Sequence, residues 1–139
     1  MTDRAALLVI LLMLATSAPL AQQAAPDQAI ERGVGDFVAA VRRGSLADVV
    51  RKIDECWDQL ARTPRDLPRA VYCSAFNFAA EDFDKRASST FGAGQTISIV
   101  EARVHSRRAL SAAGISPTSA DGFIEIIHQR SIAAISRHF

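Results

Sequence analysis

Residues 46–80 read LADVVRKIDECWDQLARTPRDLPRAVYCSAFNFAA, and this stretch decides the fold. Its first part carries apolar side chains at three- and four-residue steps, which is the spacing of one helix face. These residues are Leu46, Val49, Val50, Ile53, Trp57 and Leu60. Ser45 precedes them, and Asp48 stands where a capping box would carry Glu. The pattern therefore predicts an amphipathic helix that begins just after Ser45.

The second part of the stretch predicts a turn followed by another helix. Thr63 is suited to cap that helix and Pro64 to occupy its first turn, while Pro68 delays regular helix to about that position. The helix should run to about Ser88. Apolar side chains surround much of its circumference: Val71, Cys73, Ala75, Phe76, Phe78, Ala79, Ala80 and Phe83. A helix that is apolar on most sides is usually central in the fold.

Cys56 and Cys73 are the two cysteines of the chain, and they lie symmetrically about the predicted turn. Residues equidistant from the turn of an antiparallel helical hairpin lie at the same height, so a disulfide would need little backbone strain. A redox pair usually has C-x-x-C spacing, which is absent. A metal site completed by His105 and His128 would lack any known ligand spacing. We therefore predict a structural disulfide and no metal.

The rest of the chain also favours helices. We expect one at 27–43, where Gly33 and Gly35 weaken it and Gly44 ends it. A loop is expected at 88–95, a helix at 96–113 and a last helix from Pro117. The β-branched start of 96–113 leaves open a short strand there. The expected fold is all-α, a single domain at 27–139 with about five helices and one disulfide-stapled hairpin.

Residues 1–21 have the pattern of a secretory signal peptide. Arg4 precedes a charge-free apolar run at 5–15, and small residues with a proline follow to Ala21. The strongly apolar run is shorter than the ~20 residues of a spanning helix. Cleavage after Ala21 or after Ala18 is left open, and residues 22–26 are expected to form a linker. The signal predicts a periplasmic or secreted protein that contacts the membrane only during export, and an uncleaved anchor is the alternative.

The composition narrows the functions further. The chain has 16 basic and 15 acidic residues and a net charge of +1, which gives no electrostatic case for nucleic acid. Arginine far outnumbers lysine, a bias associated with GC-rich bacterial genomes. No sequence pattern indicates a cofactor.

Candidate catalytic residues are weakly supported. The three histidines, His105, His128 and His138, stand among polar neighbours and are expected at the surface. Glu81, Asp82 and Asp84 cluster late in the third predicted helix, where we expect an ordinary solvated face. We therefore predict no catalytic residue.

Two basic pairs could form a partner surface. Arg42 and Arg43 end the first predicted helix, and Arg107 and Arg108 lie near the end of the fourth. Cations there interact favourably with the helix dipole, which by itself explains them. If the fold brings the pairs together, they could contact anionic lipid or an acidic partner.

The Cys56-Trp57 and Tyr72-Cys73 pairs, followed by Asp82 or Asp84, carry a resemblance over about residues 54–86. This hairpin resembles small secreted bacterial proteins of unassigned role and, distantly, lysozyme-inhibitor-like cysteine-hairpin domains. The resemblance assigns no functional residue. We expect an exported, non-enzymatic interaction module of the bacterial envelope that binds a protein or an envelope component. The alternatives are a small envelope hydrolase using Glu81, Asp82 or a histidine, and a membrane-tethered accessory subunit that keeps its leader.

Overall fold

A computed structural model describes residues 18–139, with the surroundings of side chains described from Pro26 onward. The predicted signal peptide at 1–21 lies outside the described residues, except that its last four residues belong to the first helix. Among the described residues, none of the helices combines the length and apolar character that crossing a bilayer requires.

The described chain folds into five helices and contains no strand, which confirms the all-α prediction. The helices are α2 (Ala18–Arg43), α3 (Leu46–Arg62), α4 (Leu67–Phe91), α5 (Ile99–Ala112) and α6 (Pro117–Ile135). The uncertain segment at 96–100 forms no strand. Instead, Ser98 is the N-cap of α5, and its hydroxyl accepts a hydrogen bond from the backbone of Glu101.

Three predicted boundaries are wrong. The helix α2 begins at Ala18, so residues 22–26 are helical and not a linker. Ala and Gln are strong helix formers, and a proline at position 26 removes one backbone donor without ending the helix. Thr63 is the C-cap of α3, whereas Asp66 is the N-cap of α4. The helix α4 continues to Phe91 and ends where Gly92 adopts a left-handed backbone with φ of 68°.

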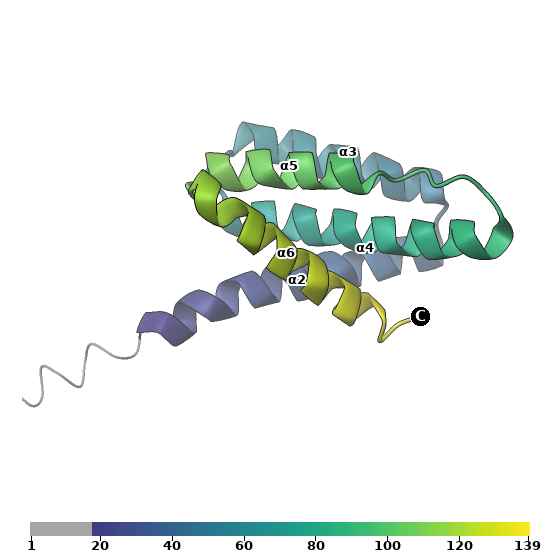
Figure 1. Ribbon diagram of the computed structural model, residues 1–139, viewed down its shortest axis with the longest axis horizontal. Helices are drawn as coiled ribbons and strands as arrows, with labels where there is room; N and C mark the ends of the chain where they lie inside the picture. The colour runs from purple at the N-terminus through teal and green to yellow at the C-terminus, as the bar shows by residue number, and fades with distance from the viewer. Residues whose placement is uncertain (1–17) are drawn as a thin grey trace, which may run out of the picture.

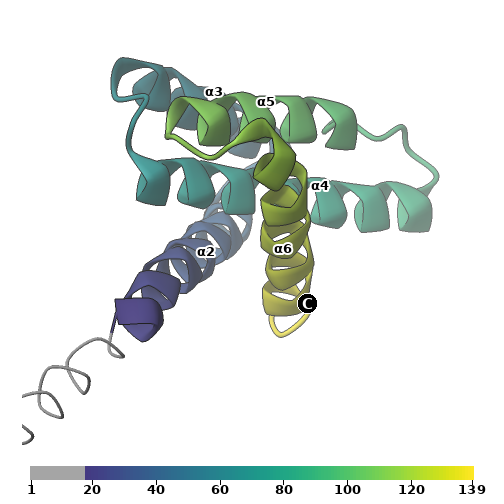
Figure 2. The ribbon, with the colours of Figure 1, turned by 60° about the vertical axis from the view of Figure 1, so that its left-hand side comes forward.

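The helix α4 is central, as its apolar sequence predicted, and it contacts each of the other four helices. In Figures 1 and 2, α3 and α5 lie side by side above α4, and α2 and α6 cross it from below. Side chains from all five helices form one buried core around α4, including Phe37, Val49, Phe78, Leu110 and Ile124. This arrangement leaves both long flanks of α3 facing other helices.

The disulfide between Cys56 and Cys73 joins α3 to α4, as predicted. The two Cα atoms are 5.8 Å apart, within the range that a disulfide spans without moving the backbone. Both cysteines are buried. The disulfide therefore fixes the position of α3 along the length of the central helix α4.

Candidate functional site

Two hollows lie on opposite flanks of α3. One, which we call the Trp57 groove, lies between α3 and α5. The other, which we call the Lys52 cleft, lies between α3 and the helices α2 and α4. Helical periodicity places Trp57 and Lys52 on different faces of α3, so the two hollows do not share a wall on this helix.

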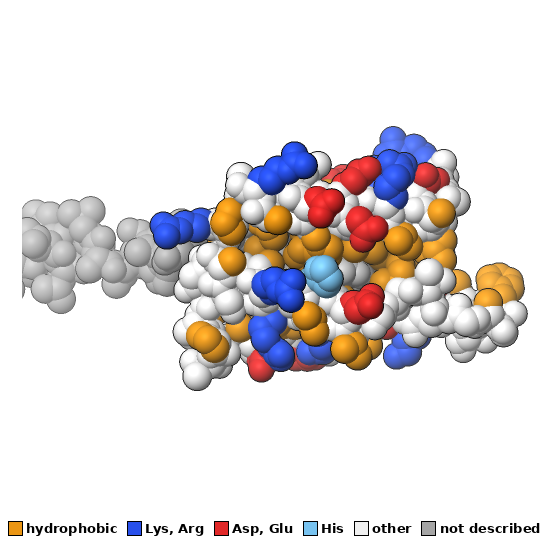
Figure 3. Space-filling model, turned by 90° about the horizontal axis from the view of Figure 1, so that it is seen from above, with side chains coloured by type: hydrophobic (Ala, Val, Ile, Leu, Met, Phe, Trp, Pro, Cys, Tyr) orange, Lys and Arg blue, Asp and Glu red, His pale blue; other side chains and the backbone are white. Residues whose placement is uncertain are grey.

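The Trp57 groove is mainly apolar and has a volume of about 320 Å³. Its lining consists of Trp57, Leu60, Ala61, Pro64, Ala109 and Ala112, with the polar residues Asp58, His105 and Arg108. Figure 3 looks down on α3 and α5 and shows hydrophobic side chains in the strip between them. The groove is therefore an apolar surface that none of the described helices covers.

A smaller hollow of about 100 Å³ continues the groove and shares Trp57 and His105 with it. The rings of these two residues lie 5.4 Å apart. The indole nitrogen of Trp57 is buried and has no hydrogen-bond partner among the described residues. Asn77 of α4 also lines the smaller hollow, although only 5% of this residue is exposed. Polar groups are thus present at the inner end of an otherwise apolar groove.

Acidic side chains border the groove and its extension. Asp54 and Asp58 project from α3, and Glu101 projects from α5. Within the described part of the chain, none of these three carboxylates forms an ion pair or a side-chain hydrogen bond. Unpaired carboxylates beside an apolar strip favour a ligand that is both apolar and cationic.

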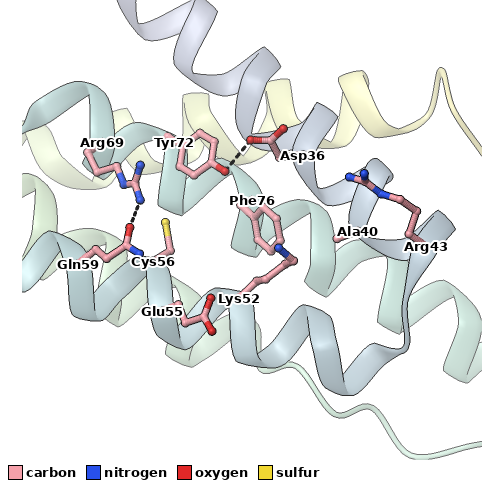
Figure 4. Close-up of a pocket in the computed structure, with 10 residues that line it drawn as sticks. All are labelled: Asp36, Ala40, Arg43, Lys52, Glu55, Cys56, Gln59, Arg69, Tyr72 and Phe76. Atoms are coloured by element: carbon pink, nitrogen blue, oxygen red, sulfur yellow. Dashed lines mark hydrogen bonds between the residues drawn. The ribbon is translucent and has the colours of Figure 1, made fainter.

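The Lys52 cleft is polar and has a volume of about 350 Å³ (Figure 4). One end of it is closed by interactions between its own walls. The Tyr72 hydroxyl donates a hydrogen bond to Asp36 of α2 at 2.8 Å. The Arg69 guanidinium donates to Gln59 of α3 and lies 5.2 Å from the centre of the Tyr72 ring. Burial, followed by the bond to Asp36, raises the pKa of Tyr72 to about 12, so the phenol stays protonated.

The other end of the Lys52 cleft is open. Arg43 reaches it from α2 and Lys52 from α3, and the ring of Phe76 of α4 lies beside the end of Lys52 in Figure 4. Neither cation forms an ion pair within the described residues; Arg43 donates only to the carbonyl of Ala39, at 3.1 Å. The wall also includes Cys56 of the disulfide. The cations at this end are therefore available to a ligand.

The prediction of a solvated carboxylate face on α4 is wrong. Glu81 and Asp84 are only 5% and 3% exposed because residues 92–98 fold back over this end of the helix. Asp84 accepts hydrogen bonds from the backbone amides of Thr96 and Ile97, at 2.6 and 2.7 Å. Glu81 accepts one from the side chain of Gln95 at 3.0 Å. These two carboxylates hold the loop in place.

The third carboxylate, Asp82, pairs with Arg86 at 2.7 Å on the same helix, although this contact lacks the geometry of a hydrogen bond. The three acidic side chains thus have different partners. They do not converge on a shared open space.

The three histidines lie in separate places. His105 is exposed in the Trp57 groove, and His138 lies near Arg42 and Arg43 at the end of α2. His128 packs on Phe78, with ring centres 4.9 Å apart, and its Nδ1 lies 3.2 Å from Arg103. Burial and this neighbouring cation lower the pKa of His128. In the described part of the chain, no cluster of three or more His, Cys, Asp or Glu residues could hold a metal ion.

The two arginine pairs do not form one basic surface. Arg42 and Arg43 lie on α2, while Arg107 and Arg108 lie on α5, and these helices do not contact each other. Arg107 is paired with Asp121 of α6. Each pair therefore has its own surroundings, and Arg43 and Arg108 line different hollows.

Only some residues of the two hollows could be recognised from the sequence. Trp57 belongs to the apolar stripe that predicts α3, but this stripe does not distinguish a residue that lines a groove from one that packs in the core. Asn77, and the hydrogen bond from Tyr72 to Asp36, were missed because their importance depends on contacts between helices that are distant in sequence. A buried polar residue such as Asn77 in an apolar helix is the one signal that could have been noticed.

The chain matches no protein-family model, no curated protein and no solved structure. Its function therefore has to be inferred from the geometry of the two hollows and from the chemistry of their side chains.

Proposed function

We propose that this chain is an exported, non-enzymatic interaction module of the bacterial envelope, and that it binds a partner through the Trp57 groove. The observation that carries this proposal is the uncovered apolar strip between α3 and α5. Contiguous apolar surface on a small domain is typical of a site of interaction.

Export is supported by two independent features. The pattern of residues 1–21 is that of a secretory signal peptide. The disulfide between Cys56 and Cys73 fits an oxidising compartment, such as the periplasm or the extracellular space. Intact-mass spectrometry under non-reducing conditions, on protein purified from envelope extract, should show that the leader is removed and that the disulfide is formed. Retention of the leader would instead support a membrane-tethered subunit.

The chemistry of the groove favours a basic amphipathic segment as the partner. An apolar side chain of such a segment fits beside Trp57, in the way that amphipathic helices lie in apolar grooves. Its lysine or arginine side chains would meet Asp54, Asp58 and Glu101 at the border.

Trp57 is the one tryptophan in the chain, so its fluorescence reports occupancy of the groove. We expect a synthetic amphipathic peptide of leucine and lysine to shift the emission saturably. A matched peptide of leucine and glutamate should not, because its charges repel the acidic border. Equal binding of both peptides, or no saturable shift with either, would contradict the proposed partner.

Two exposed alanines of α3 provide a matched pair of variants. Ala61 lines the groove, while Ala47 lies near the start of the same helix and outside it. Ala61→Lys should abolish peptide binding by filling the groove and repelling the cationic segment, whereas Ala47→Lys should leave binding unchanged. The same variants test the alternative of an enzyme. If the chain hydrolysed envelope material, and if Glu81→Gln lost this activity while Ala61→Lys kept it, the proposal would be overturned in favour of an enzyme.

A further inference from the structure

The Lys52 cleft combines free cations with an aromatic wall, and it is separate from the Trp57 groove. Arg43 and Lys52 face its open end from two different helices, and neither has an acidic partner among the described residues. A volume of about 350 Å³ is within the range of pockets that hold small molecules. The cleft therefore has the size and the unpaired donors of a ligand site.

The polar side chains at the closed end of the cleft already bond to one another, and these bonds hold the shape of this end. Tyr72 bonds to Asp36 across α2 and α4, and Arg69 bonds to Gln59 across α3 and α4. The disulfide fixes α3 against α4 beside these contacts. Because the walls are tied together at this end, a ligand entering the open end would meet a preformed site, which reduces the ordering cost of binding.

The charges of the cleft indicate which ligand it takes. Arg43 and Lys52 attract an anion, and the guanidinium fork of arginine matches a planar carboxylate. Asp36 and Glu55 also line the cleft and repel a group of higher negative charge. Glu55 is paired with Arg51 at 3.0 Å, and Asp36 accepts a hydrogen bond from the Tyr72 hydroxyl. A single negative charge is therefore favoured over two.

We propose that the Lys52 cleft binds a small organic monoanion, with its carboxylate near Arg43 and Lys52 and its apolar body against the half-buried ring of Tyr72, at the base of which lies the buried Phe76. This site does not depend on the function proposed for the Trp57 groove. Aromatic side chains supply contact area for such a body, while the two cations fix its orientation.

Benzoate is a suitable probe, and its binding can be followed by NMR chemical shifts of the full mature chain. Saturable shifts should appear at residues of the cleft. Benzyl alcohol should bind at least tenfold more weakly because it lacks the charge. Phenyl phosphate, which carries a second charge near neutral pH, should also bind more weakly because Asp36 and Glu55 repel it.

Matched variants separate the cleft from general charge effects. Lys52→Met and Arg43→Met should each weaken benzoate binding by about three- to tenfold, since each removes one charge-assisted contact. Lys85→Met and Arg42→Met remove the same charges outside the cleft and should leave the affinity unchanged. All four side chains are exposed, so the variants should remain folded, which circular dichroism verifies.

Three results would overturn the proposal. One is the absence of saturable shifts in the cleft with benzoate. Another is equal weakening in the cleft variants and in their controls, which would indicate a nonspecific response to net charge. The third is loss of benzoate binding in Ala61→Lys, which would place the probe in the Trp57 groove.

Discussion

At the scale of the residue, two glycines of α2 that look alike in the sequence have different surroundings. A Cβ atom on Gly33 would lie 2.6 Å from the carbonyl oxygen of Tyr72 and 3.1 Å from the Cβ atom of Ala75. A Cβ atom on Gly35 would have no neighbour within 4 Å. Gly33 thus permits the close approach of α2 to α4, while Gly35 is only a weak helix former.

We expect Gly33→Ala to destabilise the fold by about 1–3 kcal/mol, because the backbone of α4 must shift. Gly35→Ala should stabilise it by about 0.5–1 kcal/mol through helix propensity. Urea unfolding followed by circular dichroism measures both effects. If Gly33→Ala stabilised the fold as Gly35→Ala does, the close contact at Gly33 would be disproved.

His128 should make the fold less stable in mild acid. Its pKa is lowered in the folded state by burial and by Arg103, so the folded chain binds the proton less readily than the unfolded chain. As the pH falls through the ordinary value of 6.5, the unfolded state gains protons first and stability decreases. The decrease ends once the pH is below the folded-state pKa.

The measurement is the free energy of unfolding from pH 8 to pH 5. His128→Gln should flatten this profile, whereas His138→Gln, at an exposed position, should leave it as in the wild type. A profile that is unchanged by His128→Gln would show that another group causes the pH dependence.

At the scale of the element, α3 shows how a local sequence signal produces structure. The Ser45 hydroxyl accepts from the Asp48 amide at 3.3 Å, and Asp48 accepts from the Ser45 amide at 3.0 Å. This is the capping box that the sequence predicted, with Asp in place of Glu. The hydrogen bond from the Ser45 amide, followed by those from Arg51 and from the Ser45 hydroxyl to the same carboxylate, lowers the pKa of Asp48 to about 2.

Ser45→Ala should cost about 1 kcal/mol of stability because it removes the cap. Ser116→Ala is the matched control, since Ser116 is the N-cap of α6 but its side chain makes no capping hydrogen bond. Urea unfolding should therefore show a smaller loss for Ser116→Ala. Equal losses in both variants would mean that the capping box contributes nothing specific.

At the scale of the whole molecule, the disulfide holds α3 on the central helix and forms part of the Lys52 cleft. Cys56 and Cys73 are 17 positions apart, and closing a loop of this size is expected to stabilise the fold by ~3 kcal/mol in the chain-entropy description. Reduction of the wild-type chain should lower the free energy of unfolding by about that amount. The comparison requires the same urea series with and without reductant. Identical unfolding curves would show that the bridge does not stabilise the fold.

Local sequence patterns were sufficient to predict most of the helices. Apolar spacing and caps predicted α3 and α6, because such signals act within a few residues along the chain. The disulfide followed from the symmetry of Cys56 and Cys73 about a turn. The start of α2 was misplaced because its Ala- and Gln-rich segment lacks an apolar period, although the propensity of these residues for helix is high.

Periodicity, spacing and composition along the chain are sufficient to establish an all-α fold with a disulfide-stapled hairpin. The packing of the helices, in contrast, places Glu81 and Asp84 under a loop that they hold, and it separates the two arginine pairs. It also decided that α3 is bordered by an apolar groove and a polar cleft. Such features arise where helices that are distant in the sequence meet, and the packing of the whole core sets the angles and faces at which they meet.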